Sequence, residues 1–452
     1  MTRLHASPAR RPLELLEYVA ISAGMAVAAS CYMVLGLLAG AHTMGELVFV
    51  IVAAGAMCLL FALAIGEMSA RLPSAPGIRT YVKRAFGDRV SLFFTYLLLL
   101  VIPLVAAVEI KVFLAALLPG ASIATQCAGA TVLVGLLAGL NLAGRDLPRN
   151  AQTLVFCALV ALSFFFSAMG LAVPAPASVS SAAAPVATTS LAHGVGLAFF
   201  LYVGFEWVAP MARSPEAAQR VVPWSMVIAV LLVGAMYLSF GMALKRMLPP
   251  EALAGGAPHV ALGELLLGTP GRWALQGLSL FALLTTLNAG LMGASRLVYG
   301  LAREQALGRG ASAALARVSA AGVPAAAILA LAGCSLLSAF WVIAGDRAAV
   351  VAGVGAGLYT CVYGAFAASH LKLRKLPGRA PGFRARVPGP VYLVLAALAA
   401  GVAAATLADT LQGNVAGWSA LLAFACAAAL LSHRVAKGKS ARAATTQAVR
   451  TP

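Results

Sequence analysis

Long apolar runs recur along the whole sequence, and they restrict the fold more than any other feature does. Many are long enough to cross the hydrocarbon core of a bilayer, which takes ~20 apolar residues per helix. Of the 452 residues, 62% are hydrophobic and 10% are charged, whereas soluble domains carry about 25% charged residues. We therefore expect an all-α integral membrane protein, with the lipid bilayer as its surroundings.

Twelve candidate spans can be placed along the sequence. They lie near residues 17–39, 46–66, 90–118, 122–143, 150–173, 190–211, 221–245, 273–301, 323–343, 348–370, 388–409 and 415–432. The connectors between them are short, and even the longest, 174–189 and 246–272, lack the features of a folded domain. The first apolar run is too long for the apolar part of a cleavable signal peptide, so we expect it to remain as a span.

The net charge of +18 could suggest a nucleic-acid partner, but the placement of the charges argues against one. Lysine and arginine concentrate in alternate connectors and in the two termini, which together hold 27 of the 32 basic residues. This asymmetry is typical of cytoplasmic loops in membrane proteins. We therefore predict a multi-pass protein of a bacterial inner membrane, with both termini cytoplasmic and no nucleic-acid partner.

Small residues interrupt spans 1 and 6 at matching places. Span 1 has Gly24 and the run from Ala26 to Ser30, and span 6 has Gly194, Gly196 and Gly204. Each of these spans opens a block of five, so the second block must sit inverted relative to the first. Interrupted helices at matching positions of inverted repeats point to the central site of a transporter. The alternative is that small residues only let helices pack closely.

These observations give a division of the chain into five parts. They are a cytoplasmic N-terminus (1–16), a first five-helix repeat (17–173), a second, inverted five-helix repeat (190–370), helices 11 and 12 (388–432) and a basic cytoplasmic tail (433–452).

Three separated stretches carry a resemblance to a known family. They read GEMSARLP and YVKRAFG within 66–87, AFFLYVGFE at 198–206, and TLNAGLMGASRLVYGLARE at 286–304. In this order and on these spans they resemble the amino acid–polyamine–organocation (APC) transporters, of the amino acid permease type. The resemblance implies a LeuT-type fold with a 5+5 inverted repeat and broken helices 1 and 6. It also implies secondary transport of amino acids or related small amines by alternating access.

The resemblance further implies which residues contact the solute. The substrate-binding residues expected from it are Ala28, Ala29, Ser30, Phe200, Val203, Gly204 and Asn288. The family has two glycines in its unwound segment of span 1, and here alanine and serine replace them. Their Cβ atoms make a left-handed backbone costly. We therefore expect this segment to hold a substrate carboxylate less well than the family's segment does.

Three ionisable residues lie well inside predicted spans, namely Glu109, Lys111 and Glu206. Such residues are costly in a membrane and usually have a function. By resemblance, Glu206 is a candidate proton carrier; the alternative is a structural partner for N–H groups of the broken helix. Glu109 could balance a substrate ammonium, a proton or Lys111. Together with the changed span 1, it suggests a solute with an amine whose α-carboxylate is absent or not read by span 1.

Other classes of function find little support in the sequence. It contains neither a GxSxG nor a Walker motif, and its seven cysteines lie in apolar segments without CxxC spacing. We therefore predict no enzyme activity, cofactor or metal site. A channel and a membrane-embedded enzyme remain as alternatives. The coupling ion, exchange and the solute itself stay open, with a proton favoured over sodium.

Overall fold

The fold is built from helices that cross a membrane. The computed structural model describes residues 10–72, 78–144, 149–180, 190–212, 214, 216–319, 322–376 and 382–450, and these form helices and no strand. Eleven helices are long and apolar enough to span a bilayer, and a bent helix pair supplies a twelfth span. The expected twelve-span all-α architecture is confirmed. Parts of the predicted N-terminal segment and connectors (1–9, 181–189 and 377–381) lie outside the described residues.

Both repeats begin with a broken helix. The first five spans are α1 (Arg10–Ala26) with α2 (Ala29–Ala41), α3 (Met44–Arg71), α5 (Asp88–Leu117), α6 (Ile123–Leu142) and α7 (Arg149–Ala172). The next five are α9 (Leu191–Phe200) with the 3-10 helix η1 (Phe205–Met211), α10 (Val222–Met247), α13 (Thr269–Arg303), α15 (Ala325–Ala344) and α16 (Ala348–Arg374). Spans 11 and 12 are α17 (Gly389–Thr410) and α18 (Val415–Arg450).

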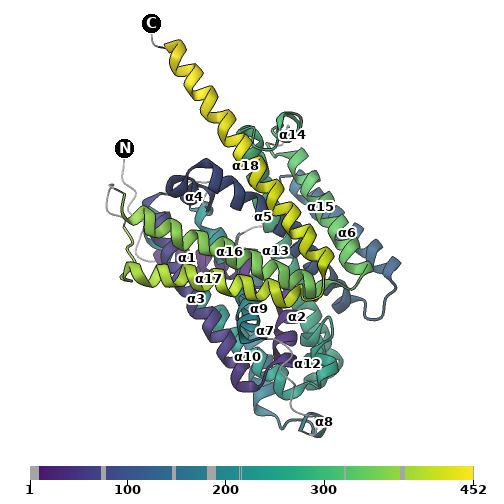
Figure 1. Ribbon diagram of the computed structural model, residues 1–452. Helices are drawn as coiled ribbons and strands as arrows, with labels where there is room; N and C mark the ends of the chain where they lie inside the picture. The colour runs from purple at the N-terminus through teal and green to yellow at the C-terminus, as the bar shows by residue number, and fades with distance from the viewer. Residues whose placement is uncertain are drawn as a thin grey trace.

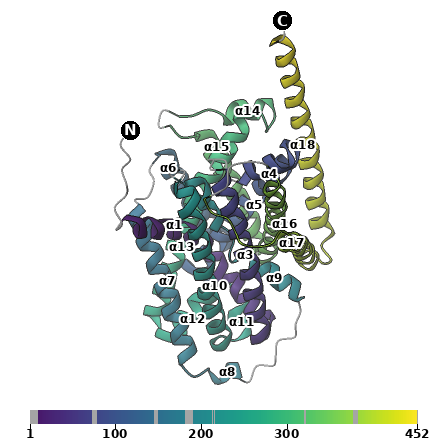
Figure 2. The same ribbon diagram turned by 90° about the vertical axis from the view of Figure 1, so that its left-hand side faces the viewer.

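Short helices cover the ends of the bundle. They are α4 (Ile78–Phe86), α8 (Ala177–Ser180), the π-helical turn η2 (Ala217–Val221), α11 (Pro250–Leu253), α12 (Pro258–Leu267) and α14 (Arg309–Leu315). Figures 1 and 2 show α4, α14 and the far end of α18 at one end of the molecule, and α8 and α12 at the other. The helix α4 carries three of the basic residues behind the predicted orientation, Arg79, Lys83 and Arg84.

The last helix extends further than the sequence suggested. We expected span 12 to end at residue 432 and a separate tail to follow, but α18 continues as one helix to Arg450. In both views it runs past the rest of the bundle.

Small residues let span 6 pack deeply into the bundle. Gly55 of α3 and Gly234 of α10 both face the ring of Tyr202, and a Cβ at Gly55 would lie 2.6 Å from its hydroxyl. That hydroxyl donates a hydrogen bond of 2.9 Å to the carbonyl of Ile51. Close packing through small residues is how helices associate in membranes, and here it anchors the chain next to the break in span 6.

Candidate functional site

Span 1 is broken at Val27 and Ala28. The axes of α1 and α2 meet at 57°, and Ala28 has an extended backbone (φ −112°, ψ 153°) at the N-cap of α2. The first N–H groups of a helix have no partner within it, and a capping side chain usually accepts from them. Alanine has no oxygen to do so, so the start of α2 needs an acceptor from elsewhere in the fold.

Glu109 of α5 supplies that acceptor. Its Oε1 accepts from the N–H of Ala29 at 2.7 Å and its Oε2 from the N–H of Ser30 at 2.8 Å. A carboxylate at a helix N-terminus is also favoured by the helix dipole. The expectation that this backbone holds a substrate carboxylate less well than the family's segment does stays a prediction, because here the protein's own carboxylate occupies the N–H groups. The Cβ atoms of Ala29 and Ser30 leave the N–H groups accessible.

Span 6 is broken next to Gly204. The α-helix α9 ends at Phe200, a turn follows, and Gly204 has φ +121°, a conformation that residues with a Cβ rarely adopt. A Cβ there would also overlap the carbonyl oxygen of Met25 in α1. Ser22 of α1 donates a hydrogen bond of 2.8 Å to the carbonyl of Phe205. The two breaks are therefore in direct contact, as the fold class requires.

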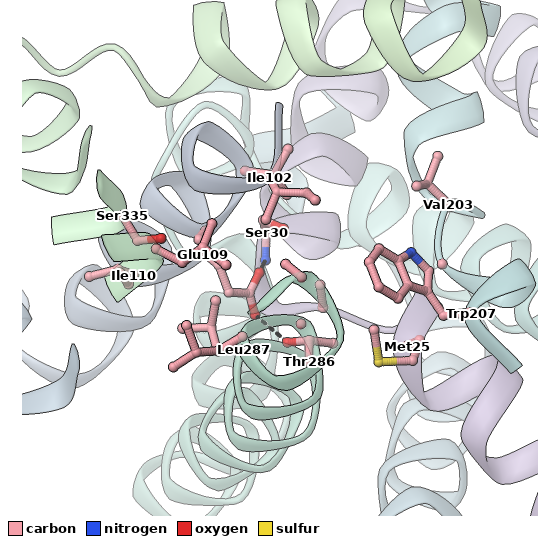
Figure 3. Close-up of a pocket in the computed structure, with 18 of the residues that line it drawn as sticks. Met25, Ser30, Ile102, Glu109, Ile110, Val203, Trp207, Thr286, Leu287 and Ser335 are labelled. Atoms are coloured by element: carbon pink, nitrogen blue, oxygen red, sulfur yellow. Dashed lines mark hydrogen bonds between the residues drawn. The ribbon is translucent and has the colours of Figure 1, made fainter. Parts of the chain in front are cut away.

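A cavity of about 140 Å³ lies beside the two breaks, bounded by spans 1, 3, 4, 6, 8, 9 and 10. Six of the predicted site residues line it: Ala28, Ser30, Glu109, Phe200, Val203 and Gly204. In Figure 3 the carboxylate of Glu109 lies at the centre of the cavity, between Ser30 and Thr286. The same view places Met25 and Trp207 to one side of it and Ser335 to the other.

The other predicted site residues lie outside the cavity lining. Ala29 contributes its N–H to Glu109. Asn288 accepts a hydrogen bond of 2.8 Å from the amide of Asn141. Glu206, which is 2% exposed, accepts from the N–H of Gly204 and from the hydroxyl of Tyr363. The site therefore divides into a cavity centred on one glutamate and a separate buried glutamate at the break of span 6.

Lys111 does not neutralise Glu109. Its ammonium donates to the Oε1 of Gln126 at 3.2 Å and lies 3.5 Å from a carboxylate oxygen of Asp346, which is 87% exposed. Two positions along a helix point about 200° apart, so the two side chains leave α5 on different faces. This removes one of the three partners that we considered for Glu109.

Trp207 and Ser335 are among the cavity residues that the sequence analysis missed. Trp207 lines the cavity directly after the span 6 motif, and Ser335 is one of two serines in span 9, the other being Ser338. A serine in a mostly apolar span is a usable signal. It does not say, however, whether the side chain faces a cavity or bonds to its own helix.

Two helices broken near their centres and facing one cavity in a twelve-span bundle define a membrane transporter of the inverted-repeat type. The sequence model described as "Amino acid permease" matches residues 13–431. The chain therefore belongs to the amino acid permease family, a family of multi-pass membrane transporters.

Comparisons with individual proteins agree with this assignment. The chain is 27% identical over 246 residues to the uncharacterized amino acid permease YecA of Bacillus subtilis (strain 168), covering 51% of this chain and 55% of that protein. It is 25% identical over 327 residues to the vacuolar cationic amino acid transporter 2 of Arabidopsis thaliana, covering 66% and 51%. The matches thus span about half the length of these relatives.

A solved structure shares the fold. It is a manganese transporter of Eremococcus coleocola in complex with an aromatic bis-isothiourea compound, with a TM-score of 0.63 over 96% of this chain and 95% of that chain. At 12% identity this likeness concerns the fold alone.

Proposed function

We propose that this protein is a secondary active transporter that carries amino acids or related small amines across a bacterial inner membrane by alternating access. The observation that carries the proposal is the cavity where the breaks of spans 1 and 6 meet. Broken helices offer backbone N–H and C=O groups to a solute. Such groups are tolerated at membrane depth because they are buried in the protein or line its cavity. Membership in the amino acid permease family supports the same class of solute.

Counterflow in proteoliposomes tests the proposal. Vesicles preloaded with an unlabelled amine or amino acid should take up the labelled solute faster than empty vesicles, and uptake should saturate. A channel would give uptake without acceleration by the internal solute. An enzyme would give a chemically altered product. If no member of a broad panel of amines and amino acids is exchanged, the proposal is wrong.

We further propose that Glu206 carries the coupling proton. It is buried at the break of span 6, and Tyr363 donates to the same oxygen that accepts from Gly204. A carboxyl that changes protonation there would change its bonds to the break. Glu206→Gln should flatten the pH dependence of uptake, whereas the exposed Glu264→Gln should keep it. An unchanged pH profile in Glu206→Gln would leave Glu206 with a structural role.

A further inference from the structure

The start of α2 is an anion site that the protein fills itself. Free N–H groups and the helix dipole make a helix N-terminus attractive to a carboxylate or phosphate. Here both carboxylate oxygens of Glu109 occupy it, at 2.7 and 2.8 Å from the nitrogens of Ala29 and Ser30. A solute carboxylate would have to displace Glu109 or approach it as a like charge, which is unfavourable at short range. The cavity therefore disfavours the binding of solutes that carry a carboxylate.

Glu109 is also the one charged side chain among the described residues that line the cavity. None of the described lysines, arginines and histidines forms an ion pair with it, and the hydroxyl of Thr286 lies 3.5 Å from its Oε1. The helix dipole corresponds to about half a positive charge, so it balances only part of the carboxylate's charge, and a single ammonium can serve as the remaining partner. A dication would bring a second charge into an apolar cavity that has no second carboxylate, and burying an unpaired charge is costly.

The rest of the lining is suited to an apolar body. Phe200, Trp207, Ile102 and Leu291 lie around the cavity with other aliphatic side chains. The volume of about 140 Å³ is close to that of an engineered cavity of about 150 Å³ that binds benzene. A ring or a short branched chain therefore fills the available space.

From these three observations, and resting on the proposed transport function, we infer that the solute is a primary monoamine with an apolar body and no carboxylate. Glu109 is its counter-ion and takes the place that a solute carboxylate would otherwise occupy on α2. An ordinary α-amino acid and a diamine are both disfavoured, the first by its carboxylate and the second by its extra charge.

Three probes separate these solutes without any mutation. 2-Phenylethylamine and L-phenylalanine share a skeleton and differ by the carboxylate, and butane-1,4-diamine carries two ammonium groups. In thermal stabilisation of the purified protein and in competition for counterflow, phenylethylamine should act at concentrations at least about tenfold lower than either of the others, a difference of about 1.4 kcal/mol. Equal or better action of phenylalanine or the diamine would overturn the inference.

Variants then test the role of Glu109. Glu109→Gln should weaken the binding of phenylethylamine at least about tenfold, because the buried counter-ion is lost. Glu109→Ala should in addition free the N–H groups of α2 and shift the preference towards phenylalanine. Glu264→Gln makes the same charge change on the exposed surface of α12 and should behave as wild type. Phenylethylamine binding that is unchanged in Glu109→Gln would contradict the inference.

Failure of the inference and failure of the proposed function look different. If the protein exchanges amino acids but not monoamines, it is a transporter and only the assignment of the solute is wrong. If it exchanges none of the amines and amino acids tested, the transport function itself is wrong.

Discussion

Gly204 is the residue on which the contact between the two broken helices most depends. Its φ of +121° and the nearby carbonyl of Met25 leave no room for a side chain. A positive φ costs a residue with a Cβ about 1–2 kcal/mol, and forcing an atom into a packed site costs about 1–3 kcal/mol more.

Gly204→Ala should therefore lower the free energy of unfolding by about 2–5 kcal/mol and abolish most uptake. The matched control is Gly135→Ala in α6, where a Cβ meets nothing within 4 Å. In the interior of a helix, a change from glycine to alanine should raise the free energy of unfolding by about 0.5–1 kcal/mol. Unfolding in detergent and uptake in proteoliposomes measure both effects. Wild-type behaviour of Gly204→Ala would show that the break does not have the described geometry.

The burial of His259 in α12 should make the free energy of unfolding depend on pH. The side chain is fully buried. Its Nε2 forms a hydrogen bond with the hydroxyl of Ser279, and its ring centroid lies 4.9 Å from that of Tyr32. Burial lowers the pKa of His259 from 6.5 to about 3. Below pH 6.5 the unfolded state takes up a proton that the folded state does not. The contribution of His259 to stability is thus complete above pH 6.5 and is lost as the pH falls towards 3.

The loss should approach about 1.4 kcal/mol per pH unit below pH 6.5. His259→Gln removes this titration, so its unfolding temperature should fall less steeply between pH 7 and pH 4.5 than that of the wild type. His433→Gln, at an exposed position, should follow the wild type. Equal slopes for His259→Gln and the wild type would contradict the prediction.

At the level of elements, Glu67 joins α3, α16 and the connector before α17. Its carboxylate is fully buried and accepts from Arg71 at 3.1 Å, His370 at 3.1 Å, Arg374 at 2.6 Å and the N–H of Ala385 at 3.2 Å. Arg374 also donates to the carbonyls of Ala385 and Val387 at 2.6 and 2.7 Å. This junction fixes the connector on the end of the bundle.

Glu67→Gln should lower stability by about 3–5 kcal/mol, since breaking a buried ion pair leaves charge uncompensated. The connector should also loosen, so trypsin should cut at the exposed Arg384 faster than in the wild type. Glu216→Gln, at an exposed site, serves as the control. Unchanged cleavage and stability in Glu67→Gln would show that the junction contributes little.

The sequence predicts the elements well and their contacts poorly. Apolar runs locate the spans, and Gly204 within a recognisable motif locates the break of span 6. The acceptor for α2, however, comes from Glu109, 80 residues further along the chain. The rise per residue of a helix places Glu109 near mid-membrane but does not say which helix faces it. The expectation of weak binding of a substrate carboxylate considered the backbone of span 1 alone and could not include the neighbouring carboxylate that occupies its N–H groups.

At the scale of the whole molecule, the distribution of charge predicts the orientation in the membrane. Figure 2 shows α4, α14 and the far end of α18 at one end of the bundle, and the sequences of these helices carry lysine and arginine. Basic residues favour the cytoplasmic side. We therefore expect the C-terminal ends of the even-numbered spans at the cytoplasmic side. The turn between α17 and α18 should lie at the opposite side.

Two single-cysteine substitutions that flank α17 test this orientation. Arg384 and Gln412 are both exposed, and α17, at Gly389–Thr410, crosses the membrane between them. With a membrane-impermeant maleimide applied to intact cells, Gln412→Cys should be labelled and Arg384→Cys should not, while permeabilised cells should label both. The unmodified protein, with its seven native cysteines, gives the background for each measurement. If Arg384→Cys alone is labelled in intact cells, the protein has the orientation opposite to the predicted one. Labelling of both would mean that α17 does not span the membrane.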